Sequence, residues 1–203
     1  MRIGVLAVQG AFIEHEKQLA AVAAHSGELI ECIEIRQKTD LERIDGIVLP
    51  GGESTVQGKL LKNLDIFDEL QALILQGIPT LATCAGLILL AQTLKDDPVK
   101  HLATLPVTVQ RNAYGRQLGS FSVSSDVGEI TDFPLVFIRA PYITEVSSDT
   151  KILTIVNHHI VGVEYQNQIC LAFHPEMTND TRIHEYFIRK VKDYLLRYPE
   201  SQE

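Results

Sequence analysis

Short, continuously apolar runs alternate with amphipathic stretches along the first half of the chain. The apolar runs are long enough for buried strands and cover residues 3–8, 29–35, 46–49 and 80–83. Between and after them, apolar side chains recur at helical spacing, in residues 11–24, 66–75 and 86–94. Buried strands that alternate with helices are typical of a parallel sheet covered on both faces. The pattern therefore predicts an α/β fold.

The second half of the chain has a different pattern. From about residue 107 to residue 173, strand-like runs follow one another with little helix between them, which predicts antiparallel strands. A final helix buries one stripe, formed by Ile183, Phe187, Val191 and Leu195. Asp180 or Thr181 can cap this helix. We expect a single domain over residues 1–203: a mostly parallel central sheet flanked by helices, with antiparallel additions at one edge.

Composition narrows the classes of partner. The chain has 203 residues, of which 45% are hydrophobic, enough for one well-buried core. Its net charge of -8 provides no basic surface for nucleic acid or for an anionic membrane. No apolar run reaches the roughly 20 residues of a spanning helix, and the first residues show no signal-peptide cleavage pattern. We therefore expect a cytoplasmic protein with neither nucleic acid nor membrane as a partner.

The three cysteines have different settings. Their odd number and wide spacing argue against a disulfide framework or a zinc site. His158 and His159 are adjacent and would point to opposite faces of a strand, so we expect no metal there. Cys32 and Cys170 lie inside strand-like runs, where cysteine usually acts as a small apolar residue. Cys84 instead lies where a strand gives way to a helix.

A thiol at a tight strand-to-helix turn gains thiolate character from the helix N-terminus and becomes nucleophilic. The small neighbours Ala82, Ala85 and Gly86 leave room for a sharp turn and for a substrate carbonyl. Taken alone, the pattern around Cys84 fits a buried structural cysteine equally well.

The segment F-H-P-E supplies a base for such a thiol. In an extended chain, positions i and i+2 share a face, so His174 and Glu176 can lie side by side. Cys84, His174 and Glu176 then form a nucleophile, a base and an orienting carboxylate. If F-H-P-E is considered without Cys84, a surface turn with solvated side chains is a better interpretation than a catalytic pair.

The segment P-G-G-E-S-T follows the third strand. Its glycines, Gly51 and Gly52, can point backbone N–H groups into the site, and one of these with the N–H of Ala85 would form an oxyanion hole. A plain turn capped by Ser54 or Thr55 is compatible with this interpretation. The segment matches no nucleotide-binding motif.

Two arginines close apolar strands. A guanidinium at the end of a strand, such as Arg111 or Arg139, can bind a carboxylate through two hydrogen bonds. Taken singly, each of them is more often a surface or ion-pair arginine.

Six blocks occur in order along the chain: L-A-V-Q-G-A-F-x-E-H, L-P-G-G-E-S-T, T-C-A-G-L-I-L-L-A, R-N-A-Y-G-R-Q, F-I-R-A-P and F-H-P-E. With these blocks the chain, from Val5 to Glu176, resembles the glutaminase subunits of pyridoxal 5'-phosphate synthase, which are class I glutamine amidotransferases. Related glutaminases for histidine, purine or pyrimidine synthesis usually follow the nucleophile with x-G-x-Q or x-G-x-H. Here A-G-L-I follows it, which favours the vitamin B6 branch.

The resemblance implies that Cys84 attacks the side-chain amide of L-glutamine, while His174 manages the protons and Glu176 holds His174. It also implies a set of residues around the bound glutamine: Gly51, Gly52, Glu53, Ser54, Arg111, Ile138 and Arg139. The loop at Gln9 and Gly10 would help to form the oxyanion hole when a partner docks. That partner is a barrel-shaped synthase subunit, which receives the ammonia. No cofactor is expected in the glutaminase itself. The family commonly has glycine where this chain has Ala82, so we expect a small backbone adjustment at the turn.

Two other functions remain compatible with the residues. A cysteine peptidase or deglycase on a similar scaffold would use the same thiol, but it would not explain Arg111 and Arg139. An interaction module would keep Cys84 as a structural residue only.

Overall fold

The computed structural model of the chain describes residues 1–111 and 120–198. Most of the R-N-A-Y-G-R-Q block lies outside the described residues. The first half consists of β1 (Arg2–Leu6), α1 (Phe12–Ser26), β2 (Glu31–Ile35), the 3-10 turn η1 (Lys38–Leu41), β3 (Gly46–Leu49), α2 (Ser54–Asn63), α3 (Phe67–Leu75), β4 (Thr80–Thr83) and α4 (Ala85–Leu90). The second half consists of β5 (Ala91–Leu94), β6 (Leu105–Gln110), β7 (Ser120–Val127), β8 (Ile130–Ile138), β9 (Tyr142–Val146), β10 (Lys151–Val156), β11 (His159–Tyr165), β12 (Gln168–Leu171), η2 (Pro175–Met177) and α5 (Arg182–Arg197).

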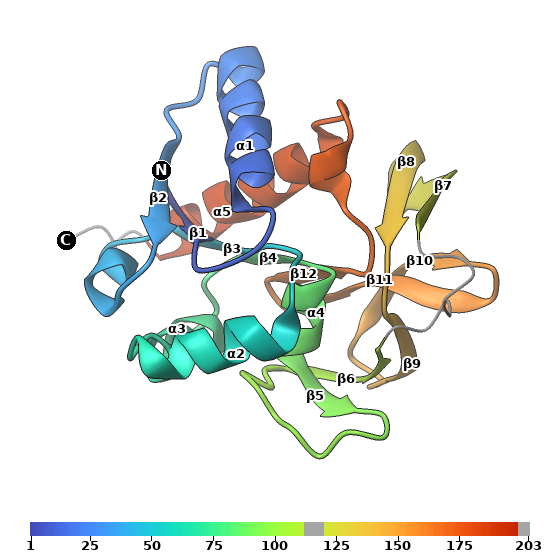
Figure 1. The fold of residues 1–203 in the computed structure, drawn as a ribbon. Coiled ribbons are helices and arrows are strands. Elements are labelled where there is room, and N and C mark those ends of the chain that lie inside the picture. Colours follow the sequence, from blue (N-terminus) through green and yellow to red (C-terminus); the bar gives the residue numbers. More distant parts are fainter. Residues whose placement is uncertain (112–119, 199–203) are drawn as a thin grey trace.

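The main sheet confirms the predicted fold class. Its strand order is β2-β1-β3-β4-β12-β11-β9-β6-β5, with β10 paired to β11. The five strands from β2 to β12 are parallel, and β11, β9 and β6 continue the sheet with antiparallel pairings. Two details differ from the prediction. The edge strand β5 is parallel to β6, and β7 with β8 forms a separate hairpin beside the sheet (Figure 1).

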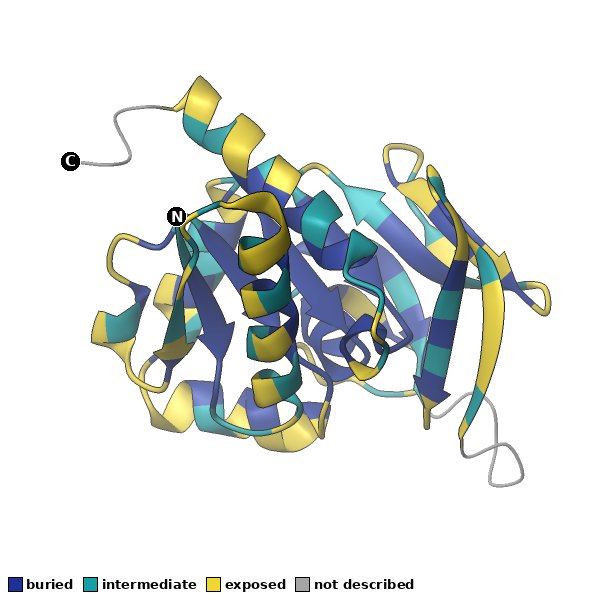
Figure 2. Cartoon of the chain, turned by 90° about the horizontal axis from the view of Figure 1, so that it is seen from above, coloured by how far each residue is buried: buried dark blue, intermediate teal, exposed yellow. Residues whose placement is uncertain are grey.

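Helices cover both faces of the parallel part of the sheet. α1 and α5 lie on one face, and α2, α3 and α4 lie on the other (Figure 1). Figure 2 shows the strands between them as buried and the outward side of α1 as exposed. This layering explains the continuously apolar strands, since a strand covered on both faces has no solvent side.

One predicted helix is wrong in its second half. The sequence pattern placed a helix over residues 86–94, but α4 ends at Leu90, and Ala91 has the extended backbone angle ψ 132°. Residues 85–90 are all buried, so the apolar run has no polar face from which the end of the helix could be read. Ala91–Leu94 instead forms an edge strand with an exposed centre.

Two predicted helix caps also differ. Neither Ser54 nor Thr55 caps α2, because both lie within its first turn and Glu53 precedes it. At α5, the Thr181 hydroxyl donates to the Glu185 carboxylate instead of capping the backbone. The Asp180 carboxylate accepts the backbone N–H of Arg182.

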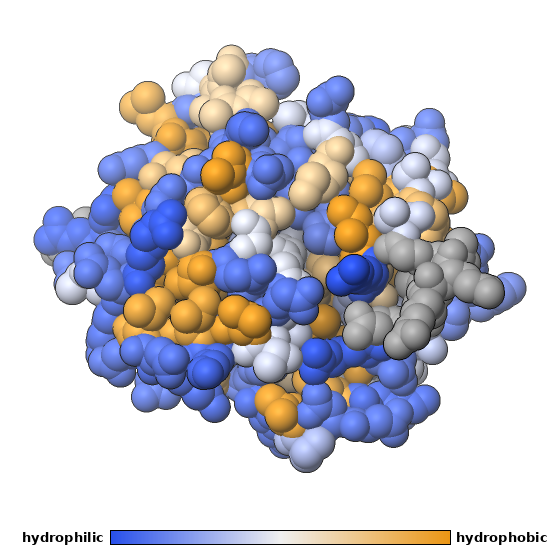
Figure 3. Space-filling view, in the orientation of Figure 1, coloured by the Kyte–Doolittle hydropathy of each residue, from blue (hydrophilic) through white to orange (hydrophobic). Residues whose placement is uncertain are grey.

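The surface is mixed. On the face seen in Figure 3, apolar patches are interrupted by charged and polar side chains. Within residues 1–111 and 120–198, none of the helices is long and apolar enough to cross a membrane.

Candidate active site

Strand register brings the chemistry-bearing segments together. β4 lies between β3 and β12, with Leu49 opposite Ala82 and Leu171 opposite Thr83. The residues that follow these strands therefore leave the sheet at the same edge. An ideal Cβ built on Gly51 would lie 2.3 Å from Cε1 of His174 and 3.4 Å from Cβ of Cys84. Only glycine fits at position 51, where the backbone passes directly against both side chains.

Cys84 occupies a strained backbone position between β4 and α4. Its φ of 47° and ψ of -99° are rarely adopted by residues other than glycine, at a cost of about 1–3 kcal/mol. The backbone is equally confined two residues later in α4, because a Cβ on Gly86 would lie 2.2 Å from the Leu49 carbonyl oxygen. Ala82 keeps its regular pairing in the strand, so the strain is confined to Cys84. Cys84 is 7% exposed and lines a cavity.

His174 and Glu176 form a close buried pair. Nδ1 of His174 lies 2.7 Å from Oε1 of Glu176. The predicted contact is present, but the expected extended backbone is wrong, because Pro175–Met177 forms the 3-10 turn η2. The backbone N–H of His174 donates to the Val136 carbonyl of β8 at 2.8 Å, so the β7–β8 hairpin also holds the imidazole in place.

Two opposing effects set the protonation of this pair. Burial lowers the pKa of His174, but interactions with Cys84 and with Glu176 outweigh burial and raise it to about 10. Burial likewise acts to raise the pKa of Glu176, but His15 and His174 outweigh it and lower that pKa. The geometry therefore favours an imidazolium held against a carboxylate, with the thiol next to it.

A cavity of about 510 Å³ opens over Cys84 and His174. Most of the predicted site residues line it, namely Gln9, Gly10, Gly51, Gly52, Glu53, Ser54, Cys84, Arg111, Ile138, Arg139 and His174. Ala11 and Ile88 line it as well. Of the predicted residues, Ala85 and Glu176 do not. Ala85 is the first residue of α4 behind the thiol, and Glu176 is buried behind His174.

The loop after β1 is tied to the turn after β3. The N–H of Ala11 donates to the Gly51 carbonyl at 3.0 Å, and the N–H of Glu53 donates to Oε1 of Gln9 at 2.8 Å. Gly10 has φ 104°, and a Cβ there would lie 2.0 Å from the Gly51 carbonyl oxygen. The orientation of the peptide between Gly51 and Gly52 therefore depends on this loop.

The two predicted arginines have different settings. Arg111 is held by Asp97, at 2.9 Å from Nη1, and by the Thr55 hydroxyl, at 3.2 Å from Nη2. Arg139 has φ 46°, is exposed and forms no ion pair with any residue in the described part of the chain. Both side chains line the cavity, so its lining carries two guanidinium groups.

Comparison with known proteins identifies the family of the chain. The model of the SNO glutamine amidotransferase family matches residues 5–193. The chain belongs to the SNO glutamine amidotransferase family.

Relatives of this family member are similar along nearly their whole length. A protein of Desulfitobacterium hafniense called "Pyridoxal 5'-phosphate synthase subunit PdxT" is 55% identical over 94% of this chain and 94% of its own. A Streptococcus pneumoniae protein of the same name is 44% identical over 95% of this chain and 99% of its own. A crystal structure of a glutamine amidotransferase superposes with a TM-score of 0.87 at 36% identity, covering 94% of this chain and 98% of that one.

Sequence reasoning missed three polar residues near the site of this SNO family member. His15 and His184 are fully buried behind Glu176, and Asp97 holds Arg111. His15 lies in the block A-F-x-E-H, three residues after Phe12 and four before Leu19, so helical periodicity could have placed it on the buried face of α1. No local pattern could have identified Asp97, because its partner lies on another element.

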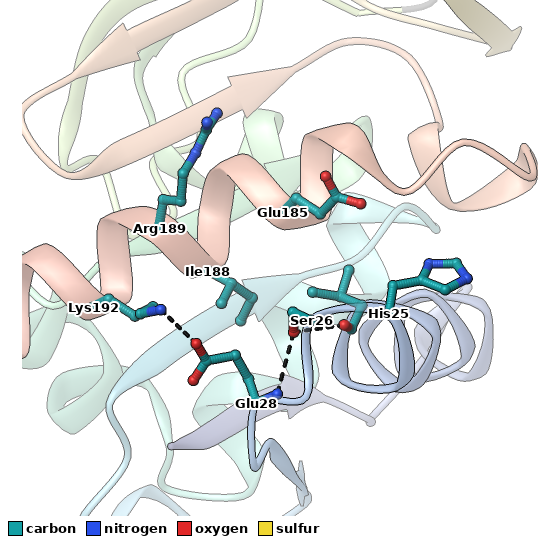
Figure 4. Close-up of a pocket in the computed structure, with 8 residues that line it drawn as sticks. His25, Ser26, Glu28, Glu185, Ile188, Arg189 and Lys192 are labelled. Atoms are coloured by element: carbon teal, nitrogen blue, oxygen red, sulfur yellow. Dashed lines mark hydrogen bonds and ion pairs between the residues drawn. The ribbon is translucent and has the colours of Figure 1, made fainter.

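A second cavity, of about 310 Å³, lies between α1 and α5 (Figure 4). Polar side chains that include His25, Glu185 and Arg189 line it, and Lys192 is paired with Glu28. None of the predicted site residues lines it. In the described ranges, there is also no cluster of three His, Cys, Asp or Glu side chains suited to hold a metal ion.

Proposed function

We propose that the chain hydrolyses L-glutamine to L-glutamate and ammonia through a thioester on Cys84, and delivers the ammonia to the synthase subunit of pyridoxal 5'-phosphate synthase. The observation that carries the proposal is the convergence of three groups at one edge of the sheet. Cys84 sits on a strained turn, His174 lies beside it, and Glu176 holds the imidazole at 2.7 Å. The family and the names of its relatives indicate the nitrogen donor and the pathway.

The first half of the reaction forms the thioester. The Cys84 sulfur attacks the side-chain carbonyl carbon of glutamine, and the carbonyl π electrons move to oxygen. The oxyanion is stabilised by backbone N–H groups, for which Ala85 at the start of α4 and Gly52 are the candidates. His174 donates its proton to the amide nitrogen, the C–N bond breaks, and ammonia leaves.

The second half regenerates the thiolate. His174, now neutral, takes a proton from water, and the resulting hydroxide attacks the thioester carbon. The C–S bond breaks, the new side-chain carboxyl group loses its proton to solvent as glutamate leaves, and the thiolate again faces a protonated His174. Only protein groups and water take part, so this reaction requires no cofactor.

Charge around the cavity suits the α-amino acid end of glutamine. The guanidinium groups of Arg111 and Arg139 are of the right sign for the α-carboxylate. The Glu53 carboxylate, which is exposed on the cavity wall, is of the right sign for the α-ammonium group. Asp97 fixes the position of Arg111, so this guanidinium is already ordered before substrate binds.

The link between the loop and the turn supports control by a partner. Because the N–H of Ala11 holds the Gly51 carbonyl, a partner that moves the loop at Gln9 and Gly10 would free the Gly51–Gly52 peptide to rotate. Exposed apolar side chains stand on the two helices that follow this loop and this turn, Ile13 on α1 and Val56 on α2. We propose that the synthase subunit docks here and completes the oxyanion hole.

A cytoplasmic location belongs to the same proposal. Cys32, Cys84 and Cys170 are free thiols. Free thiols, one of them proposed as a nucleophile, suit a reducing compartment.

The decisive measurement is ammonia release from glutamine by the purified chain, with and without the synthase subunit. We expect release that rises when the subunit is added and disappears in Cys84→Ser. Ammonia release by Cys84→Ser with the partner present would show that the thioester mechanism is wrong. Absence of hydrolysis in both wild-type samples would favour the interaction module, and turnover of a peptide or glycated substrate without glutamine would favour a peptidase or deglycase.

Alkylation separates an activated thiol from a structural one. A glutamine-like electrophile should label Cys84 well ahead of Cys32 and Cys170. Burial raises the pKa of Cys32 to about 11 and raises that of Cys170 further above its usual range. Peptide mapping by mass spectrometry reads out the order. Equal labelling of all three thiols would argue against activation of Cys84.

A further inference from the structure

A row of buried polar side chains continues behind Glu176, away from Cys84. His15 of α1 lies with Nε2 3.4 Å from Oε2 of Glu176 and 3.1 Å from Oγ1 of Thr83. On its other side, Nδ1 of His15 lies 2.9 Å from Nε2 of His184 on α5. Both imidazoles are fully buried. The row therefore joins the two helices on one face of the sheet to the carboxylate that holds His174.

The second oxygen of Glu176 needs a donor. Oε1 receives the proton of His174, whereas Oε2 is buried and has no hydrogen bond of normal length in the described part of the chain. A buried carboxylate oxygen without a donor is costly. The nitrogen Nε2 of His15, at 3.4 Å, is placed to supply one, and contacts of this kind often shorten when substrate binds.

The tautomer of His15 follows from its neighbours. If Nδ1 carried the proton, the lone pair of Nε2 would face the anionic Oε2 of Glu176. If Nε2 carries the proton, it donates to the Thr83 hydroxyl at 3.1 Å and lies 3.4 Å from Oε2 of Glu176, and Nδ1 accepts the N–H of His184. Nδ1 of His184 has no partner among the described residues in either arrangement, so the contact with Glu176 decides between them.

We propose that His15 is a positioning residue: as the neutral Nε2–H tautomer, fixed by His184, it donates to Oε2 of Glu176 and so orients the carboxylate that holds His174. The inference rests on the proposed glutaminase function. Each carboxylate oxygen of Glu176 then has a donor, His174 at Oε1 and His15 at Oε2. The triad alone supplies only the first of these donors.

Protonation and burial agree with this assignment. The groups that face His15 are Glu176, His174 and His184 from other elements and Glu14 from its own helix. Burial lowers the pKa of His15, and Glu176 opposes that shift only in part. Burial and the neighbouring His15 lower the pKa of His184 well below its usual value. Both imidazoles are therefore neutral near pH 7, as the donor chain requires.

The position of His15 also links the site to the loop at Gln9 and Gly10. α1 begins at Phe12, directly after this loop, and His15 is in its first turn. A displacement of the loop that shifts α1 would therefore change the contact with Glu176 as well as the Gly51 peptide.

Substitutions of similar volume test the donor directly. His15→Gln keeps an N–H that reaches toward Glu176, whereas His15→Leu removes it. We expect His15→Leu to lower kcat for glutamine by about tenfold to a hundredfold with little change in KM, and His15→Gln to retain most of the activity. His25→Leu, an exposed histidine on the same helix, is the control and should match wild type. Equal activity of the Gln and Leu variants would overturn the inference.

The pH profile distinguishes positioning from packing. Loss of a donor to the ionised carboxylate raises the pKa of Glu176. The acid limb of kcat/KM should therefore move to higher pH in His15→Leu and stay in place in His15→Gln. A His15→Leu variant with lower activity but an unmoved acid limb would show that only packing was lost.

A measurement on the wild-type protein tests the tautomer without turnover. Nitrogen-15 NMR of the histidine side chains, assigned with His15→Gln, should show His15 as the neutral Nε2–H tautomer at pH 7. The Nδ1–H tautomer or an imidazolium would overturn the inference. If the wild type shows the expected tautomer but releases no ammonia with its partner, the proposed function fails while the arrangement at Glu176 stands.

Discussion

His174 connects the proposed catalysis to stability at the scale of a single residue. Its pKa of about 10 in the folded chain lies above the usual value of 6.5. The charged imidazole therefore stabilises the fold fully below about pH 6.5, and this contribution is lost as pH rises through about 10. The contribution is of the order of a few kcal/mol.

We expect the free energy of unfolding of wild type to fall between pH 6.5 and pH 10 more steeply than that of His174→Gln. Urea unfolding at half-unit pH steps measures both curves. His25→Gln, which removes an exposed imidazole, is the control: it shows how the free energy of unfolding depends on pH when a histidine outside the buried pair is lost. Parallel curves for wild type and His174→Gln would contradict a raised pKa in the folded state.

The same residue shows what local sequence can and cannot predict. The spacing of His174 and Glu176 predicted their contact, but the backbone between them is a 3-10 turn and not extended. A short turn and an extended chain can both bring side chains two positions apart into contact. Sequence spacing therefore predicted the pair without determining its conformation.

At the scale of elements, the turn after β3 packs directly against the imidazole of the site. A methyl group on Gly51 would meet the imidazole of His174 at 2.3 Å, and that ring cannot move aside while Glu176 holds it. Gly51→Ala should therefore displace His174 or the turn, at about 1–3 kcal/mol of stability. A displacement of about 1 Å at the reacting groups can lower the rate roughly a hundredfold.

We expect Gly51→Ala to lower glutamine hydrolysis by about that factor while the chain stays folded. Gly27→Ala is the matched control, because Gly27 ends α1, has φ 71° and has nothing within 4 Å of an added Cβ. It should cost about 1 kcal/mol and leave the rate unchanged. Near wild-type hydrolysis by Gly51→Ala would mean that the turn yields more easily than its contacts indicate.

The helices and strands also show where hydrophobic periodicity fails to predict secondary structure. Alternating strands and helices correctly predicted the parallel sheet, because the inner strands β1, β3 and β4 are buried on both faces. The run from Ala85 to Leu94 misled the prediction, because α4 is buried on every side and the edge strand that follows begins within the same apolar run. A completely buried helix has no polar stripe to mark its length.

At the scale of the whole molecule, α5 closes one face of the sheet. The aromatic ring of Phe187 is fully buried, and a Cβ on Gly46 in β3 would lie 3.0 Å from its Cζ. Phe187→Ala should therefore lower the free energy of unfolding by about 3–5 kcal/mol. Leu196→Ala, on the same helix but 81% exposed, should change it by less than about 0.5 kcal/mol.

Urea unfolding of both variants at pH 7 measures the two values. Similar losses for Phe187→Ala and Leu196→Ala would show that α5 is not anchored through its buried stripe. The stripe itself was predicted from sequence, since Phe187 and Val191 recur at helical spacing and both are buried.

Sequence by itself determined which segments are candidates for the proposed chemistry. Local pattern identified the elbow at Cys84, the glycine turn and the F-H-P-E segment, because each depends on residues adjacent in the chain. Resemblance, rather than physics, supplied the substrate.

Only tertiary structure decided what stands behind and beside those segments. Arg111 pairs with Asp97 at 2.9 Å, 14 positions away in the chain. His15 lies 3.4 Å from Glu176 and 2.9 Å from His184, which are 161 and 169 positions away. Local propensity acts over a turn or two of chain, whereas these contacts exist only once strand order and helix packing have placed distant segments together.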